Sequence, residues 1–241
     1  MIAGADPRRQ SAGDEVAFNG AVALKVLIRI AAAISVIFCF FASTPVAAWD
    51  RASILSEIQR DDWEASFLNG AALERIKDTQ STELLIDLIR DQSANWRLQI
   101  RGIRVLGEIH TPKAEDTLLQ WFSDIFFHHG CPAIKSSLAL SLGNFSGRRV
   151  AAGLIEGLDD PEPLVREASI VSLGRVGDKS AVPYLIAQLS DKSFTIRVNA
   201  IHSLGLLKDA RAASYLQGIA DNDSELVLKR EALVALSLIR T

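Results

Sequence analysis

The sequence predicts an all-α fold, a right-handed solenoid of about five helical hairpins followed by a C-terminal helix. The first observation behind this prediction is a unit that recurs at an offset of 31 residues. A fixed period between 20 and 50 residues with two helices per unit is the pattern of a solenoid. Matched positions of the two copies are Asp160, Arg166, Leu173, Gly174 and Tyr184, followed by Asp191, Arg197, Leu204, Gly205 and Tyr215.

The second observation is a column of leucines with one member in each unit, namely Leu73, Leu106, Leu142, Leu173, Leu204 and Leu236. The third is composition, because 49% hydrophobic residues with 7 Pro favours an ordered, helix-rich chain. The net charge of −3 and the pI of about 5.8 exclude the basic excess that binds nucleic acid through phosphates. Of the two cysteines, Cys39 lies in a long apolar run and Cys131 in a predicted loop.

Residues 1–48 are predicted to be a polar leader and a signal peptide. Lys25 and Arg29 precede an uncharged apolar run, and the small residues Val46 and Ala48 suit cleavage after Ala48. The apolar core is short for a membrane span of about 20 residues. An uncleaved anchor in the inner membrane, formed by residues 30–48, is the alternative, and a buried core helix is a third interpretation. Cleavage would leave a single thiol and therefore no internal disulfide.

The length of the polar leader suggests that translation starts later, near Val22 or Leu24. The predicted organisation is therefore residues 1–48 as a targeting segment and residues 49–241 as the repeat domain. The protein is expected to be exported, and to be periplasmic or extracellular after cleavage.

The sequence predicts that the repeat domain is a series of helix pairs. A short helix near residues 52–58 precedes the first unit, in which one buried helix face extends over residues 63–76 and the polar residues 78–81 cap the next helix. Thr111 followed by Pro112 is typical of an N-cap and first helical position. The remaining predicted helices and units are residues 96–109, 118–122, 134–142, 150–158, 164–189, 194–220 and a final helix at 223–240.

Two further columns predict how the units stack. Glycines follow four of the leucines, at 107, 143, 174 and 205, and we expect them to let a neighbouring helix approach closely. A cation stands seven residues before most of the leucines, as at Arg166 and Arg197. We expect these two arginines to bridge to Asp160 and Asp191 as a structural ladder. The alternative is solvated charges worth up to about 1 kcal/mol each.

The run Asp159 to Asp178, which reads Asp-Asp-Pro-Glu-Pro-Leu-Val-Arg-Glu-Ala and ends Leu-Gly-Arg-Val-Gly-Asp, resembles a HEAT repeat of the type named after phycobilisome lyases. Residues 191–205 follow the same pattern, and the resemblance covers roughly residues 62–241. It implies a solenoid fold. The family includes lyases that attach or remove bilins and hydroxylases that bind iron through His-Glu pairs. This sequence has no His-Glu dipeptide and its four histidines occupy non-equivalent positions, so no cofactor is expected.

One step in the leucine column, from Leu106 to Leu142, is about five residues longer than the regular step, which places an insertion at residues 123–132. His128, His129 and Cys131 are weak candidates for metal ligands, and Cys131 is a weak candidate nucleophile. Exposure of Phe126 or Phe127 would instead make a partner-contact loop. The sequence favours a third interpretation, an extended second helix whose phenylalanines fill the core.

The candidate partner-binding residues are Trp121, Tyr184 and Tyr215, together with Phe126 and Phe127. The first three lie on second helices, which the resemblance implies line the concave face. Tyr184 and Tyr215 are in equivalent register and would form an aromatic stripe for a partner peptide, unless both rings only cover apolar neighbours. Acidic and amide side chains favour a basic or uncharged partner over nucleic acid, and they are Glu115, Asp116, Gln120, Glu156 and Gln188.

Together these observations predict a non-enzymatic scaffold or adaptor that binds a protein partner outside the cytoplasm, with no catalytic residues. The membrane would be involved only through an uncleaved N-terminal segment. The apolar final helix suits self-association or a partner. The competing prediction is a bilin lyase-like enzyme or accessory protein, or a metal-binding protein centred on residues 123–132.

Overall fold

The computed structural model describes residues 49–68, 71–91 and 95–241. The described residues form helices and connecting turns without β-strands, and the predicted all-α solenoid is confirmed. A search of these same residues finds no helix with the length and apolar character needed to cross a membrane. The predicted leader, signal peptide and apolar run of residues 1–48 lie outside the described residues.

Helical hairpins follow one another along the solenoid, and each has a first and a second helix. The pairs are α6 (Trp96–Ile109) with α7 (Pro112–Ser123), α9 (Pro132–Leu142) with α10 (Arg148–Glu156), α11 (Pro163–Val176) with α12 (Val182–Ala187), and α13 (Phe194–Leu207) with α14 (Ala213–Asn222). The C-terminal helix α15 (Leu226–Arg240) follows them. Short 3-10 turns join the later helices at Gly157–Asp159, Lys179–Ala181, Gln188–Ser190 and Ala210–Ala212.

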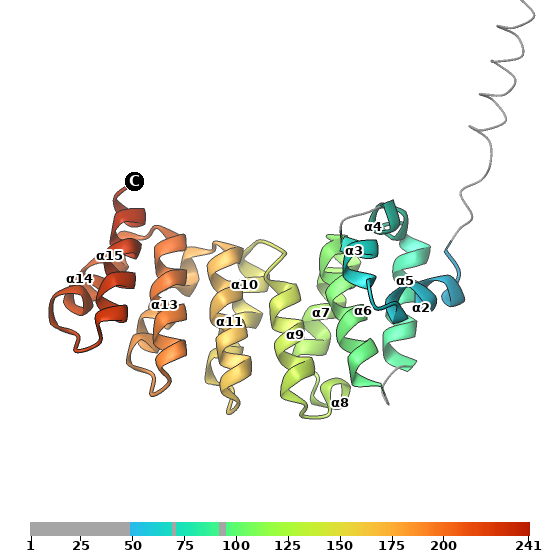
Figure 1. Ribbon diagram of the computed structural model, residues 1–241, viewed down its shortest axis with the longest axis horizontal. Helices are drawn as coiled ribbons and strands as arrows, with labels where there is room; N and C mark the ends of the chain where they lie inside the picture. Colours follow the sequence, from blue (N-terminus) through green and yellow to red (C-terminus); the bar gives the residue numbers. More distant parts are fainter. Residues whose placement is uncertain (1–48, 69–70, 92–94) are drawn as a thin grey trace, which may run out of the picture. The chain divides into compact units, whose positions relative to one another are not determined.

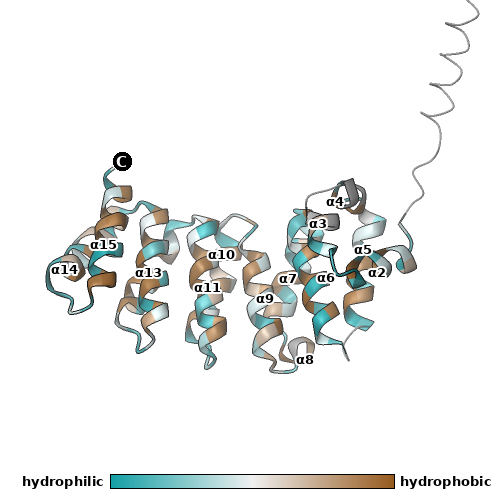
Figure 2. Ribbon diagram, in the orientation of Figure 1, coloured by the Kyte–Doolittle hydropathy of each residue, from teal (hydrophilic) through white to brown (hydrophobic). Residues whose placement is uncertain are grey.

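The first helices α6, α9, α11, α13 and α15 stand side by side in the front row of Figure 1, each in contact with the next. The second helices form the row behind them. Figure 2 shows that this front row is not uniformly hydrophilic, because the ribbon of α9 is mostly brown whereas α6 carries more teal. The front row therefore offers a partner both apolar and polar stretches.

Close contacts between neighbouring first helices confirm the role expected for the repeated glycines. A Cβ atom added at Gly143 would lie 2.9 Å from Cβ of Ser172, and one added at Gly174 would lie 2.9 Å from Cβ of Ser203. Gly107 meets Ser141 and Gly205 meets Ala235 in the same way. Because each glycine faces a small residue of the next first helix, the helices approach more closely than larger side chains would allow.

The leucine column forms the centre of the core. Leu106, Leu142, Leu173 and Leu204 are completely buried, and Leu236 is nearly so. Leu73 is only half-buried. The column therefore marks the repeats correctly, and its first member lies where the packing is least complete.

The first predicted unit differs from the others, because the single helix expected over residues 63–76 is wrong. Two short helices are found instead, α3 (Trp63–Leu68) and α4 (Ala71–Ile76), between α2 (Arg51–Gln59) and α5 (Thr79–Asp91). The predicted caps are confirmed, since Asp78 Oδ1 accepts a hydrogen bond from the amide of Ser81 at 2.9 Å and Thr111 Oγ1 accepts one from Ala114 at 3.2 Å.

Candidate partner-binding surfaces

The predicted tyrosine pair lies on the row of second helices. Tyr184 belongs to α12 and Tyr215 to α14, and the two side chains occupy equivalent positions in successive hairpins. Their residues are 51% and 54% exposed, so neither ring is enclosed by apolar neighbours. The pair therefore presents two aromatic rings to solvent, one hairpin apart.

The charged side chains of the second helices are less available than expected. Arg149 of α10 forms ion pairs with both Glu115 and Asp116 of α7. Lys113 of α7 pairs with Glu83 of α5 at 3.1 Å. These ion pairs link successive second helices and reduce the acidic character predicted for this row. Glu156 of α10 and Asp221 of α14 remain exposed and outside these ion pairs.

Trp121 was predicted to contact a partner, and the structure contradicts this. The residue is 2% exposed, and the ring of Phe127 stacks on it with centroids 4.2 Å apart and an interplanar angle of 5°. The Arg90 guanidinium lies 5.9 Å from the centroid of the Trp121 ring. Trp121 is thus a core residue, because Phe127 from the insertion covers its outer side.

The insertion also differs from the predicted extended second helix. Helix α7 ends at Ser123, and Asp124 Oδ1 then accepts a hydrogen bond from the amide of Phe126 at 2.9 Å to begin the short helix α8 (Ile125–His128). The separate turn packs the half-buried Phe127 against the core and leaves Phe126 83% exposed. Phe126 is therefore more available to a partner than Phe127.

No cluster of three or more potential metal ligands occurs among the residues that the structure describes. His129 is exposed, with a left-handed backbone at φ 48°, and Cys131 is a half-buried free thiol. The side chain of His128 lies outside the described residues. A pocket of about 240 Å³ beside Cys131 is lined by apolar residues of the insertion and of α11, and by the pair Lys135 and Asp160.

The arginines and aspartates of the predicted ladder lie together between the first helices. Lys135 Nζ is 2.6 Å from Asp160 Oδ2, and Arg166 donates from Nη1 to the backbone oxygen of Asp160 at 2.9 Å. Arg166 Nε also lies 3.6 Å from Asp191 Oδ2, and Arg197 donates to the backbone oxygen of Asp191 at 2.8 Å. Arg166 and Arg197 therefore each bind the turn that begins their own helix, and Lys135 and Arg166 reach the aspartate of the following unit.

A groove that no sequence pattern had predicted lies on the row of first helices. Its larger part, about 420 Å³, is lined by α6, α9 and α11, with Arg104, Leu140 and Arg175 among its residues. A second depression of about 300 Å³ is lined by α3 and α6, and it includes Trp63 and Trp96. Ile100 and Arg104 line both depressions, which therefore adjoin. We refer to the two together as the first-helix groove.

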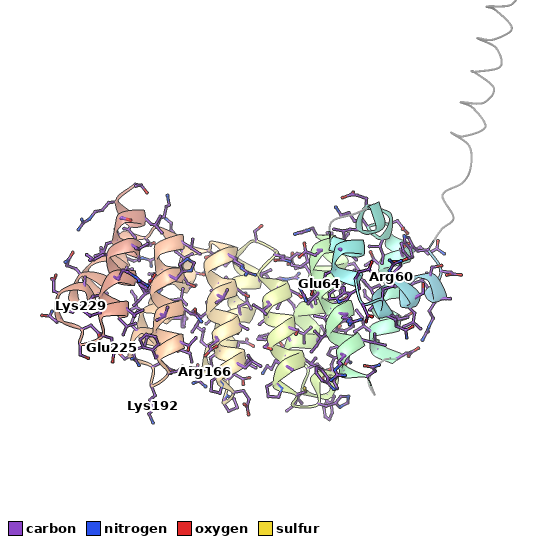
Figure 3. The ribbon with its side chains drawn as sticks, viewed as in Figure 1. Arg60, Glu64, Arg166, Lys192, Glu225 and Lys229 are labelled. Atoms are coloured by element: carbon purple, nitrogen blue, oxygen red, sulfur yellow. The ribbon has the colours of Figure 1, made fainter. Side chains whose placement is uncertain are left out.

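The arginines of the groove had a sequence signal that was overlooked. Arg97, Arg101 and Arg104 are spaced by four and three residues, which places them on one face of a helix beside Trp96. Arg104 Nη1 lies 2.5 Å from Oε1 of Glu64, which Figure 3 labels beside α6. Its guanidinium also lies 5.0 Å from the ring centroid of the buried Trp63.

Comparison with known proteins identifies the architecture. A family model described as HEAT repeats matches residues 82–173 and 150–237. Among solved structures, the chain is similar to the complex of CpcE and CpcF of phycocyanin lyase from Nostoc sp. PCC7120, with 20% identity, 83% of this chain and 80% of that chain covered, and a TM-score of 0.50.

Two artificial proteins are similar to the chain with TM-scores slightly above this value. A designed armadillo repeat protein in complex with the peptide (KR)4 has 13% identity, 79% of this chain and 100% of that chain covered, and a TM-score of 0.54. An engineered protein has 17% identity, 81% of this chain and 93% of that chain covered, and a TM-score of 0.53. No curated protein matches the sequence. At these identities the structural similarities show the fold alone.

Proposed function

The chain belongs to the HEAT-repeat family, and from that premise we propose that it is a non-enzymatic scaffold that binds a protein partner. A solenoid buries its apolar residues between successive units and leaves two long rows of helices at the surface. Such surfaces suit extended or helical segments of other proteins.

The observation that carries the proposal is the exposed pair Tyr184 and Tyr215 on the second helices. Aromatic side chains contribute much of the energy of protein interfaces, because a large rigid ring is buried with little loss of side-chain freedom. Adjacent packed helices lie about 8–10 Å apart, so one partner segment would span both rings. The partner therefore lies across α12 and α14 in this proposal.

The partner is expected to be basic or uncharged. Glu156 is exposed on the same row, and the net charge of the chain is −3. The designed armadillo repeat protein, which shares the architecture, is described in complex with the basic peptide (KR)4. A nucleic acid partner is disfavoured because phosphate backbones require a basic surface.

Site-specific photocrosslinking tests this proposal. A photoreactive phenylalanine analogue placed at Tyr184 or Tyr215 should crosslink the same identified protein in cells of the source organism. A matched probe at Lys192, at the lower edge of the solenoid in Figure 3, should not crosslink that protein. Tyr184→Ala combined with Tyr215→Ala should then weaken binding of the purified partner at least tenfold. Equal crosslinking from Lys192, or unchanged binding by the double variant, would reject the second-helix site.

The proposed location is outside the cytoplasm, with residues 1–48 acting as a leader and a signal peptide or membrane anchor. Lys25 and Arg29 followed by the uncharged run that ends in small residues support this. Sequencing the N-terminus of the protein from an exported fraction tests it. A mature chain that begins near Trp49 is expected, and a chain that begins at Met1 would contradict both cleavage and a late start.

The competing function is a bilin lyase-like enzyme or accessory protein, or a metal-binding protein centred on residues 123–132. The similarity to the CpcE and CpcF structure concerns the fold alone. Purified protein is expected to contain no stoichiometric metal and to bind no bilin in an absorption assay. Stoichiometric metal that is lost on substitution of His128 and His129, or bilin transfer to an acceptor protein, would favour the competing function.

A further inference from the structure

We propose that the first-helix groove is a second binding site, and that it takes an extended protein segment with acidic side chains at both ends and apolar side chains between them. Every residue that lines the groove comes from α3, from the first helices α6, α9 and α11, or from the turn at Asn144 that follows α9. The site therefore shares no residue with the tyrosine surface of the second helices. Loss of binding at Tyr184 and Tyr215 would therefore leave binding at this groove unchanged, and the reverse also holds.

The charge of the groove opposes that of the chain. Its lining contains four arginines and two glutamates, a formal charge of +2 in a chain whose net charge is −3. Internal contacts engage only part of this positive charge, because Arg104 pairs with Glu64 and Arg101 donates to the backbone oxygens of Ile58 and Arg60. The excess favours a ligand that carries carboxylates.

Two cations at opposite ends of the groove have no acidic partner in the described part of the chain. Arg97 of α6 contacts only the ring of Trp96, with its guanidinium carbon 5.2 Å from the centroid. Arg175 of α11 is exposed and forms no ion pair or side-chain hydrogen bond. Charge-assisted hydrogen bonds from a guanidinium to a carboxylate are among the strongest that a protein surface can offer. The two ends therefore each fit one acidic side chain.

The middle of the groove is apolar. Ile100 and Leu140 lie between the two arginines, and Leu140 is 40% exposed. Trp96, at the Arg97 end, is 49% exposed. Apolar side chains of a bound segment would cover these residues and remove their surface from water, which is favourable at about 25 cal/mol per Å².

The span of the groove sets the length of the ligand. From α6 across α9 to α11 there are two helix spacings of about 8–10 Å each, and Arg97 and Arg175 are also offset along the helix axes by about eleven residues of about 1.5 Å rise relative to the leucine column. The two arginines are therefore about 25 Å apart, and because an extended chain advances about 3.3 Å per residue, about eight residues connect them. This length and the open, elongated lining suit a peptide segment better than a compact metabolite.

The test uses fluorescence anisotropy with the full chain and a labelled eight-residue peptide that has two glutamates at each end and four alternating leucines and valines between them. Wild-type protein is expected to bind this peptide, and to bind a peptide with lysine in place of glutamate at least tenfold more weakly. Arg97→Glu combined with Arg175→Glu should weaken binding of the acidic peptide at least tenfold and should now favour the lysine peptide.

The matched control is Arg148→Glu combined with Arg240→Glu, which makes the same change in net charge at exposed positions outside the groove. The control variant, and Tyr184→Ala with Tyr215→Ala, should bind the acidic peptide as wild type does. Circular dichroism melting curves establish that each variant is folded. Trp96→Ser should weaken binding without changing the preference for acidic over basic peptide.

Several outcomes would overturn the proposal. They are the absence of binding up to millimolar acidic peptide, equal binding of the acidic and basic peptides, and equal losses in the groove and control variants. A labelled single-stranded RNA that binds more tightly than the peptide and is released by Arg97→Glu with Arg175→Glu would also overturn it, in favour of a nucleic acid ligand.

Discussion

The regular hairpins of residues 132–240 and the irregular region of residues 49–128 join their helices through different kinds of contact. In the regular part an ion pair lies between the first helices, formed by Arg166 and Asp191, whose side chains are 18% and 17% exposed. In the irregular part the ion pairs are at the surface, as between Arg104 and Glu64, whose side chains are 44% and 54% exposed. The lengths of the helices differ as well, since α3 and α4 have 6 residues each whereas α11 and α13 have 14.

The difference indicates where a binding site arises. Regular stacking repeats the same glycine contact from α11 through α13 to α15. The first-helix groove instead lies at the junction of the two parts, because its lining comes from α3 and α6 of the irregular region and from α9, the turn at Asn144 and α11 of the regular hairpins. The groove therefore forms where the strict repeat begins.

The largest expected effect tests this contrast in the leucine column. Leu204→Ala and Leu173→Ala should each lower the free energy of unfolding by about 2–5 kcal/mol, because a large side chain is removed from a fully buried site. Leu73→Ala should cost clearly less, because Leu73 is half-buried in the irregular region. Urea denaturation followed by circular dichroism measures all three. An equal loss at Leu73 would show that the irregular region is packed as tightly as the hairpins.

The next effect concerns the glycines. A Cβ added at Gly174 would lie 2.7 Å from Oγ and 3.0 Å from Cα of Ser203, so relief requires the backbones of α11 and α13 to separate. Gly174→Ala should therefore destabilise by about 1–3 kcal/mol. A Cβ at Gly102 meets only side-chain atoms of Ile89, at 2.5 Å and beyond, and Gly102→Ala should cost less because that side chain can move.

Gly218→Ala is the control for helix propensity. Nothing lies within 4 Å of a Cβ added at Gly218 in α14. The substitution should be neutral or stabilise by up to about 1 kcal/mol, since alanine is the better helix former. If Gly218→Ala destabilises the protein as much as Gly174→Ala does, the close approach of α11 and α13 does not explain the effect at Gly174.

The repeats were predictable from the sequence because they depend on local periodicity. The leucine column, the glycines and the caps at Asp78 and Thr111 follow from residue type and spacing alone. These parts of the fold therefore needed no knowledge of distant contacts.

The candidate sites were less predictable, because they depend on contacts between distant residues. Trp121 has the same sequence signature as an exposed aromatic residue, and the turn at Asp124 between α7 and α8 returns Phe127 to cover it. Exposure distinguishes Phe126 from Phe127 even though they are adjacent in the chain. The first-helix groove requires the relative positions of α6, α9 and α11, which no single segment of sequence specifies.

The third prediction compares a ladder arginine with a surface arginine. Arg166→Met removes donors to the backbone oxygens of Asp160 and Pro161 and leaves Asp191 without its ion pair, at a cost of about 1–3 kcal/mol. Arg149→Met removes ion pairs from a side chain that is 61% exposed, and should change stability by less than about 1 kcal/mol. Urea denaturation at low and high salt measures both. Equal small losses would show that the ladder is no stronger than a surface pair.

The smallest effect depends on pH and arises at the turns between the two helices of a hairpin. Asp209 begins such a turn, and its carboxylate accepts hydrogen bonds from the side chain and the backbone amide of Arg211 at 2.8–3.0 Å. These bonds, the side-chain bond above all, lower the pKa of Asp209 from 3.8 to about 2. In the irregular region the corresponding cap is Thr111, which does not titrate.

Because the folded state binds the proton of Asp209 more weakly than the unfolded state, this carboxylate stabilises the fold above about pH 4 and loses its contribution as the pH falls to about 2. Asp209→Asn preserves an N-cap side chain and removes the charge. The variant should be up to about 1 kcal/mol less stable than wild type at pH 6, and the difference should shrink on acidification. Urea denaturation at pH 6, 4 and 3 measures this difference. If the difference in free energy of unfolding between wild type and Asp209→Asn stays constant across this range, Asp209 stabilises the turn by hydrogen bonding that does not depend on its charge. The regular hairpins would then have no acid-sensitive contribution from Asp209.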